Sequence, residues 1–232
     1  DYNQQELRLL GHYEDGPLTE AYMADPWMDV HNWARTMINE LLAKNFERGP
    51  VKNIGFGLIY GMGIGLLAVK AGTDVATAKQ LKNAYLTVAP GLRDLYRDMK
   101  RVAREDDFIT TWGGREYRCE EPVIVQGRRR EFDYKLVNVL IQGGAADISK
   151  EALVRYGETK PDNHKFILSV HDQMTASVPR GELVFAMEIL RSCMEGIEID
   201  IPMLSEGEWS DTNWNDLKPY DSRGVITYKG GA

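Results

Sequence analysis

The chain has 232 residues, of which 43% are hydrophobic and 27% charged, proportions ordinary for a globular protein with one large domain or two small ones. The formal net charge of −7 argues against a uniformly basic nucleic-acid binder, although local positive surfaces can still contact phosphates. No apolar run approaches the roughly 20 residues that span a bilayer, and Cys119 and Cys193 lack metal-ligand spacing, so we expect a soluble cytoplasmic protein without disulfides or a membrane partner.

The chain is predicted to be mainly helical up to residue 105. Residues 1–8 should leave the end of a strand and enter a short helix, and residues 17–46 have the pattern of helices with a break between them. Residues 64–105 also read as helices. Within them, Asp74 is a suitable N-cap for a helix over Val75–Val88, because its side chain can accept a hydrogen bond from a free backbone N–H of the first turn.

Between these regions lies a stretch with a regular spacing, Arg48–Gly61. Its chemistry-bearing residues recur every fourth position: Arg48, Lys52, Phe56 and Tyr60. In a helix such a row drifts by about 40° per step and spans roughly 18 Å, so it stays on one face. Cations suit phosphate oxygens and aromatic faces suit bases, so the row could lie along a nucleoside triphosphate. The alternative is an ordinary amphipathic helix with the rings in the core and the cations in solvent.

The second half mixes strands and helices. Gly113-Gly114 permits a tight turn in a hairpin, and Asn138 and Gln142 share one face of a long helix because they lie four residues apart. The predicted elements are, in order, a hairpin over 108–118, a helix over 133–156, strands over 166–170 and 174–178 with a turn at 171–173, a helix over 181–195 and a polar tail over 222–232.

Basic clusters are candidate phosphate contacts in a chain that is otherwise acidic. Each of them is equally well explained by a solvated face or loop, which is the usual meaning of a charge run. The clusters are Lys100-Arg101 with Arg104, Arg115 with Arg118, and Arg128-Arg129-Arg130.

Three segments, in this order along the chain, resemble motifs of the family A DNA polymerases, the DNA polymerase I type. Residues 1–8 resemble the first palm motif, the row that ends at Tyr60-Gly61 resembles the fingers-helix motif, and Val170-His171-Asp172 resembles the last palm motif. The run from Asn138 to Asp147 is similar to a family helix that contacts primer-template DNA through its amides. Residues 199–204 resemble the closing strand of the family, and the resemblance extends from Asp1 to about Trp214.

This resemblance implies an α+β fold, in which a palm of antiparallel sheet and helices carries an inserted helical fingers subdomain. It divides the chain into a palm segment with the first catalytic motif at 1–16, fingers at 17–105, a palm segment with the second carboxylate hairpin at 106–221, and the flexible tail at 222–232. The implied activity is template-directed addition of deoxynucleoside triphosphates to a primer 3′ end by two-metal catalysis.

The resemblance also implies roles for single residues. The two Mg²⁺ ions would be held by Asp1, Asp172 and the backbone carbonyl of Tyr2, with Asp1, Asp172 and Lys52 as the catalytic residues. Lys52 would neutralise phosphate charge and donate a proton to the leaving group. The implied nucleotide-binding residues are Arg48, Lys52, Phe56, Tyr60, Gln4, His31 and Glu6, the last as a sugar gate against ribonucleotides; the implied DNA-binding residues are Arg115, Asn138, Gln142 and His171.

The chain departs from the family pattern at two positions. Gln173 follows the second palm aspartate where the family usually has Glu, and an amide adds no negative charge. Gly55 precedes the aromatic of the fingers helix where many members have Asn. Phe56 itself, where other members have Tyr, goes with poor use of dideoxynucleotides in the family.

Because the sequence opens at Asp1, we expect the carboxy-terminal part of a split or cleaved polymerase from a bacterial or phage-infected cell. Its expected partner is an amino-terminal fragment with the rest of the palm, the thumb and, where one exists, an exonuclease domain. Two alternatives remain open. One is a noncatalytic DNA-binding or assembly subunit in which Gln173 marks lost chemistry, and the other is a single-subunit RNA polymerase or reverse transcriptase.

Overall fold

The computed structural model describes residues 1–105 and 107–220, and the tail expected over 222–232 lies outside them. The described chain is α+β, as predicted, because α-helices are combined with two-stranded antiparallel sheets. It divides into two compact units. We call residues 6–147 with 200–202 the helical unit, and residues 1–5, 148–199 and the segment from 203 onward the hairpin unit.

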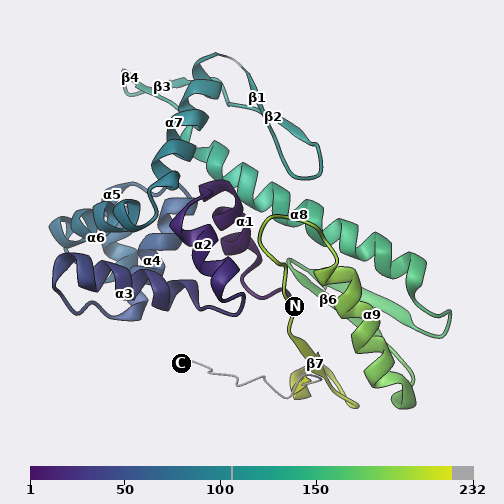
Figure 1. Cartoon of the computed structure of the whole chain (residues 1–232). Coiled ribbons are helices and arrows are strands. Elements are labelled where there is room, and N and C mark those ends of the chain that lie inside the picture. The colour runs from purple at the N-terminus through teal and green to yellow at the C-terminus, as the bar shows by residue number, and fades with distance from the viewer. Residues whose placement is uncertain (106, 221–232) are drawn as a thin grey trace. The chain divides into compact units, whose positions relative to one another are not determined.

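Helices dominate the helical unit (Figure 1) and confirm the helical prediction up to residue 105. Helix α6 begins and ends at the predicted residues, because the Asp74 carboxylate accepts the backbone N–H of Thr77 at 2.9 Å. Among the described residues, no helix has both the length and the apolar character needed to cross a membrane. The helices are α1 (Gln5–Glu14), α2 (Pro17–Ala24), α3 (Val30–Leu42), α4 (Arg48–Ile59), α5 (Ile64–Ala71), α6 (Val75–Val88), α7 (Gly91–Arg104) and α8 (Tyr134–Thr159), and the boundary between the units falls inside α8.

Helix α4 packs against α3, α5 and α6, and two glycines line its buried side. A Cβ atom at Gly55 would lie 3.0 Å from the phenol oxygen of Tyr85 on α6, and one at Gly57 would lie 2.0 Å from Cδ2 of the buried Leu67 on α5. Because neither position has a side chain, the neighbouring helices approach the α4 backbone directly. This contact fixes which face of α4 is buried and leaves the other face for the row of cations and rings.

The helical unit also contains two hairpins, of which the sequence predicted one. Strand β1 (Phe108–Thr110) pairs with β2 (Glu116–Arg118) as expected, although β1 is shorter than the apolar run suggested. Strand β3 (Val123–Val125) pairs with β4 (Arg128–Arg130) in a hairpin that was not predicted. The sequence pattern that could have indicated this hairpin is the apolar run over 123–125 followed by Gln126-Gly127. In the structure these two residues form a two-residue turn with positive φ angles of 51° and 73°.

In the hairpin unit, β5 (Lys165–Val170) pairs with β6 (Gln173–Ser177), as predicted, with α9 (Leu183–Glu195) following. Gln173 belongs to the strand rather than to the turn, because it pairs directly with Val170 and leaves a two-residue turn at His171-Asp172. The predicted helix over 181–195 starts at Leu183, after a 3₁₀ turn at Arg180–Glu182. A further antiparallel pair, β7 (Gly207–Trp209) with β8 (Lys218–Tyr220), flanks a 3₁₀ turn at Trp214–Asp216.

The predicted closing strand over 199–204 is wrong. That segment has no strand assignment, and only Ser205 forms an isolated antiparallel bridge, with Tyr2. The physical reason is Arg8, which is fully buried and donates to the backbone carbonyl of Pro202 at 2.9 Å. Pro202 has no backbone N–H to donate to a β-ladder, and its carbonyl accepts a hydrogen bond from the buried guanidinium of Arg8 rather than from a neighbouring strand.

The close approach at Gly57 gives a test of this packing. Gly57→Ala should lower the free energy of unfolding by roughly 1–3 kcal/mol, because the added methyl overlaps Leu67 in a filled interior. Gly65→Ala is the matched control in helix α5, where a Cβ would meet nothing within 4 Å, and it should raise stability by about 0.4–1 kcal/mol. Urea unfolding of the two variants measures both signs, and a Gly57→Ala protein as stable as the native chain would contradict the packing.

Candidate active site

The contacts along α4 confirm that the cation and ring residues share one face. The Lys52 ammonium lies 5.9 Å from the centre of the Phe56 ring, and the Phe56 and Tyr60 rings are stacked, with centroids 6.3 Å apart and planes within 8°. Tyr60 itself caps the helix, with its N–H donating to the Phe56 carbonyl at 3.0 Å. The result is a half-exposed strip with an ammonium group at one end and a phenol at the other.

The guanidinium of Arg48 is held by a carboxylate. It lies 2.7 Å from Oδ2 of Asp29, and the other oxygen of Asp29 accepts the backbone N–H groups of His31 and Asn32 at the start of α3. Burial alone would raise the pKa of Asp29, but the Arg48 hydrogen bond, the Asn32 N–H and the Arg48 charge outweigh it and lower that pKa. Asp29 therefore joins the N-termini of α3 and α4. Lys52, by contrast, has no ion pair within the described chain.

His31 completes the strip from the α3 side. Its ring lies 5.2 Å from the Phe56 ring, is 5% exposed, and has a buried Nδ1 with no hydrogen-bond partner. Burial lowers the pKa of His31 to about 4; the Asp29 charge opposes this shift, and the Arg48 and Lys52 charges add to it. The imidazole is therefore neutral at pH 7, and it can become a cation only if negative charge arrives nearby.

At the other end of the strip, Glu6 connects three elements. The Tyr60 hydroxyl donates to Oε2 of Glu6 at 2.9 Å, and Gln142 on α8 donates to Oε1 at 3.4 Å. Burial, the Glu6 charge and the Glu6 hydrogen bond raise the pKa of Tyr60 to about 12, so the phenol stays protonated and keeps donating. Glu6 is thus held against Tyr60 at the phenol end of the strip.

Asn138 and Gln142 lie on α8, as predicted, and differ in their surroundings. Gln142 is exposed, whereas Asn138 is partly buried and its Oδ1 has no hydrogen-bond partner. An unsatisfied buried amide oxygen is costly, so this atom is available to a donor that is brought to it. The two amides are one helical turn apart and are suited to reading hydrogen-bonding groups along a groove.

Arg115 is engaged within the protein. Its guanidinium lies 2.6 Å from Oδ1 of the buried Asp147 and donates to the Gly143 carbonyl at 2.8 Å. Asp147 also accepts the Thr111 hydroxyl and the Gly113 N–H, and these donors together with Arg115 lower its pKa although burial opposes them. Arg115 and Asp147 therefore attach the β1–β2 hairpin to α8.

In the hairpin unit, backbone hydrogen bonds bring the two predicted metal-ligand segments together. The N–H of Tyr2 donates to the Asp172 carbonyl at 3.2 Å, and the buried Tyr2 hydroxyl donates to the Met194 carbonyl at 2.9 Å. Asp1 is exposed and Asp172 half-buried, so both carboxylates are open to a ligand. His171, exposed at the hairpin tip, has a φ of 54°, a conformation uncommon for a non-glycine residue.

Gln4 and Asn3 continue this segment. Gln4 also has a positive φ, of 57°, and its amide donates to Oδ1 of Asn3 at 3.2 Å, while Asn3 donates to the Glu206 carboxylate at 2.7 Å. These bonds hold the short turn between the residues at the hairpin and the start of α1. No sequence pattern indicates the contact between Asn3 and Glu206, because the two residues lie 203 positions apart.

The donor set of the hairpin unit fits magnesium. The carboxylates of Asp1 and Asp172 and the carbonyl of Tyr2 are hard oxygen donors on adjoining segments, and Mg²⁺ commonly takes one or two carboxylates and fills its other positions with phosphate and water. Among the described residues, no group of three or more His, Cys, Asp or Glu side chains is placed to hold a metal ion. Gln173 contributes no charge, so the protein would supply two carboxylates.

The supporting contacts of two acids, Asp29 and Asp147, were not predicted from the sequence. Asp29 carried a readable signal, since an aspartate just before an apolar helical run is a typical N-cap, although its pairing with Arg48 was not readable. Asp147 carried none, because a single acid inside a long helix gives no indication of what it contacts.

Comparison with known proteins places the chain among polymerases. A model of the family described as DNA polymerase family A matches residues 1–216. DNA polymerase theta of Caenorhabditis elegans is 29% identical over 224 residues, which cover 94% of this chain and 13% of that protein. DNA polymerase I of Chloroflexus aurantiacus is 28% identical over 227 residues, which cover 94% of this chain and 24% of that protein.

A solved structure is similar as well. It is described as the POL domain of Pol1 from M. smegmatis in complex with DNA primer-template and dNTP, and it matches with a TM-score of 0.76 at 28% identity, covering 87% of this chain and 37% of that chain. The chain thus spans at most about a quarter of the length of these curated relatives.

The buried imidazole gives a pH test. The pKa of His31 is about 4 in the folded protein and ordinarily 6.5, so the unfolded chain binds the proton more readily and stability should fall as the pH drops from about 6.5 towards 4. His31→Gln should flatten this fall, by up to about 3 kcal/mol over the full titration. Urea midpoints measured from pH 7 to pH 4.5 report the slope. A His31→Gln curve as steep as that of the native chain would contradict the assignment.

Proposed function

Because the chain belongs to DNA polymerase family A, we propose that it carries active-site residues for template-directed DNA synthesis, the addition of deoxynucleotides to a primer 3′ end. The observation that carries the proposal is the continuous strip on α4, in which Lys52, Phe56 and Tyr60 follow one another in contact and end on Glu6. The similar Pol1 structure, by its description, holds primer-template DNA and a dNTP. We assign the same two ligands to this chain.

The phosphate end of the strip is assigned to Lys52, Arg48 and His31. Lys52 has no intramolecular ion pair, so its ammonium can neutralise the triphosphate without breaking an existing contact, and it can donate a proton to the leaving pyrophosphate. Arg48 can share its fork between Asp29 and a phosphate oxygen. His31 turns from a neutral donor into a cation when phosphate charge raises its pKa from the low value set by burial.

The sugar and base end is assigned to Phe56, Tyr60 and Glu6. The stacked rings offer an apolar surface to the nascent base pair, and base pairing itself supplies the sequence information. Glu6 accepts a hydrogen bond from the Tyr60 hydroxyl, and we assign to it the exclusion of the 2′-hydroxyl of an incoming ribonucleotide. The side-chain N–H groups of Asn138 and Gln142 are proposed to donate to the minor-groove acceptors that all correct pairs share.

Two Mg²⁺ ions are assigned to Asp1, Asp172 and the Tyr2 carbonyl. Magnesium bound there would activate the primer hydroxyl and neutralise the developing charge on the triphosphate. The chain's own residues hold these oxygens in place through two hydrogen bonds. The Tyr2 N–H donates to the Asp172 carbonyl, and the Tyr2 hydroxyl donates to the Met194 carbonyl. His171, at the tip of the same hairpin, and Gln4 are proposed to contact DNA and nucleotide, and Arg115 to position the β1–β2 hairpin through Asp147.

In domain terms, we propose palm segments at 1–16 and 106–221 and fingers at 17–105. The activity is assigned to an assembly that also contains polypeptide outside these 232 residues, in the same chain or in another, because the curated relatives are at least four times as long as the matched region. Exposed apolar side chains on the hairpin unit support this. Phe166 and Ile167 on β5 are 41% and 54% exposed, and Val184 and Phe185 on α9 are 58% and 51% exposed.

Removal of one carboxylate tests the proposed chemistry. Asp172→Asn keeps the size of the side chain and removes its charge. Magnesium-dependent primer extension by the assembly that contains this chain should therefore fall by at least about 100-fold. Loss of a residue that only supports a metal ligand costs about 10- to 100-fold, and loss of a ligand itself should cost at least as much. Asp162→Asn makes the same change at an exposed residue of the same unit and should leave extension unchanged. Full activity of Asp172→Asn would remove this residue from the site, and a native assembly without any extension would favour a noncatalytic subunit.

Sugar choice tests the Glu6 assignment. Glu6→Ala removes the acceptor of the Tyr60 hydroxyl and opens space beside it, so the ratio of ribonucleotide to deoxynucleotide incorporation should rise by roughly 10- to 100-fold. Single-nucleotide primer extension with each triphosphate measures the ratio. Glu20→Ala on α2, an exposed glutamate in the same unit, is the matched control. An unchanged ratio in Glu6→Ala would contradict the sugar-gate role, and a native preference for ribonucleotides would favour an RNA polymerase.

A further inference from the structure

The hairpin β3–β4 is a short, exposed ribbon. All six strand residues are exposed, and Ile124 reaches 79%. The register pairs Val123 with Arg130, Ile124 with Arg129 and Val125 with Arg128, and the positive φ angles of Gln126 and Gly127 make the turn tight. The ribbon is therefore an ordered two-stranded element whose side chains face solvent, with an apolar strand beside a strand of three arginines.

The arginines are only lightly engaged within the protein. Arg129 lies 3.4 Å from Glu131, a surface ion pair of small energetic value. Arg130 donates to the Tyr134 hydroxyl at 3.4 Å and lies 5.6 Å from the centre of the Phe132 ring. Arg128, next to the turn, has no hydrogen bond or ion pair within the part of the chain that the structure describes. Since side chains two residues apart in a strand point to the same face, Arg128 and Arg130 lie on the same face of the ribbon.

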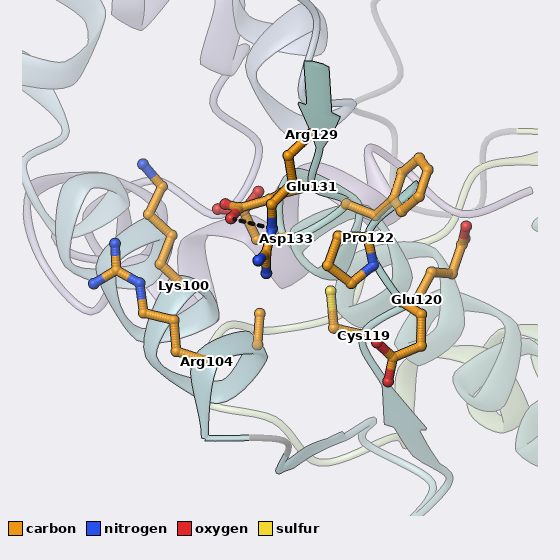
Figure 2. Close-up of a pocket in the computed structure, with 11 residues that line it drawn as sticks. Lys100, Arg104, Cys119, Glu120, Pro122, Arg129, Glu131 and Asp133 are labelled. Atoms are coloured by element: carbon orange, nitrogen blue, oxygen red, sulfur yellow. Dashed lines mark ion pairs between the residues drawn. The ribbon is translucent and has the colours of Figure 1, made fainter. Parts of the chain in front are cut away.

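Helix α7 extends this basic surface. A pocket of about 320 Å³ lies beside the ribbon and is lined by Lys100 and Arg104 of α7 together with Arg129 (Figure 2). Lys100 and Arg104 are exposed, one helical turn apart, and make no ion pair with any described residue. Other cations of the same helix are paired: Arg97 lies 2.7 Å from Asp94, and Arg101 lies 3.1 Å from Glu105. Arg93, at the start of α7, donates to the Thr87 hydroxyl at 3.1 Å and does not line the pocket. Lys100 and Arg104 are thus the cations of α7 that line the pocket without an ion pair to a described residue.

Acidic residues also line this pocket, at the base of the ribbon. Glu120 is occupied by Lys135 at 2.7 Å and Glu131 by Arg129, while Glu121 and Asp133 complete the acidic side. All four flank the two strands in sequence, before residue 123 or after residue 130, whereas Arg128 adjoins the turn. The positive charge is therefore concentrated towards the tip of the ribbon and on α7.

We propose that the ribbon Val123–Arg130 and the adjoining face of α7 bind nucleic acid through its phosphates. Guanidinium groups suit phosphate oxygens, and a two-stranded ribbon has the width that the major groove of a duplex admits. The contact is independent of sequence, because the cations meet the backbone rather than the base edges. This inference deepens the proposed function by adding a second DNA contact, separate from Asn138 and Gln142.

The base of the ribbon is connected to the end of the α4 strip. Tyr134, which receives the Arg130 hydrogen bond, packs so closely on Gly61 that a Cβ there would lie 2.7 Å from its ring. Gly61 directly follows Tyr60, the base end of the strip. Nucleic acid held by the ribbon would thus be tethered close to the nascent base pair, which identifies the template strand or the duplex ahead of it as the bound segment.

The test is equilibrium binding without magnesium or nucleotide. Fluorescence anisotropy is measured for the native assembly and for the triple variant R128Q/R129Q/R130Q, with three probes: a primer-template with a 5′ overhang, a blunt duplex and a single strand. Loss of three phosphate contacts should weaken binding at 0.15 M salt by about tenfold or more. It should also reduce the slope of log K against log salt by about 2.7 for the duplex or about 2.1 for the single strand, and the probe that shows its decrease identifies the bound form.

Two further variants make the result specific. K70Q/K79Q/K82Q removes the same charge from α5 and α6 and should leave the affinity and the slope near native. R128K/R129K/R130K keeps the charge and should keep most of the slope, and thermal unfolding should show that the exposed substitutions leave the fold intact. Native affinity and a native salt slope of R128Q/R129Q/R130Q for all three probes would overturn the proposal.

The same samples separate this inference from the proposed function. Primer extension at saturating DNA reports the chemistry, which the ribbon variant should retain because none of its changes lies on the α4 strip. An assembly that binds DNA through the ribbon but never extends a primer would refute the proposed synthesis and keep the ribbon contact. An assembly that extends primers with native DNA affinity in the ribbon variant would do the reverse.

Discussion

The close contact between α4 and its neighbours is the constraint on which the candidate site depends. Helix α4 has to bury one side completely and still leave Lys52, Phe56 and Tyr60 accessible on the other. Gly55 and Gly57 make this possible, because Tyr85 and Leu67 occupy the space that side chains at those positions would need. The cost is local: glycine weakens a helix, and the Tyr85 hydroxyl is buried without a partner. The position of α4 therefore depends on its packing against neighbouring helices rather than on its own helix propensity.

A second theme is that carboxylates decide which cations are available. Arg48 and Arg115 were both predicted to contact ligands, and each is held by an acid, Asp29 or Asp147, whose own pKa is lowered despite burial. Each pair connects two elements, so breaking it would cost positioning as well as charge. Lys52 is the residue of the strip without such an anchor. A count of basic residues therefore overstates the phosphate-binding capacity of a surface, and the contacts of each cation have to be followed one by one.

The sequence predicted what depends on local chemistry and missed what depends on distant contacts. Helix α6 was predicted to the residue because its cap, Asp74, acts within one turn, and the strip on α4 followed from a four-residue spacing. The strand expected over 199–204 failed because Arg8, far away in the sequence, takes the Pro202 carbonyl. The β3–β4 hairpin was not predicted because a run of three arginines is typical of a solvated loop, although Gln126-Gly127 before it can form a tight turn. For the candidate site, the four-residue spacing predicted which residues share one face of α4. The contact between Glu6 and Tyr60 was not predictable, because it joins segments 54 residues apart and no pattern within either segment indicates it.

Gln173 bears on how the proposed magnesium site would fill. It begins β6 and pairs with Val170 across the two-residue turn, so the hairpin that presents Asp172 does not depend on the charge of residue 173. With Asp1 and Asp172 as its acids, the protein offers two negative charges to two divalent ions, and the remaining charge and ligands have to come from the triphosphate. On the proposed function, attraction of free magnesium to these two acids would then be weaker than it would be with a third carboxylate. A nucleotide that brings its own magnesium ion would therefore supply the charge and oxygen ligands that the amide of Gln173 does not.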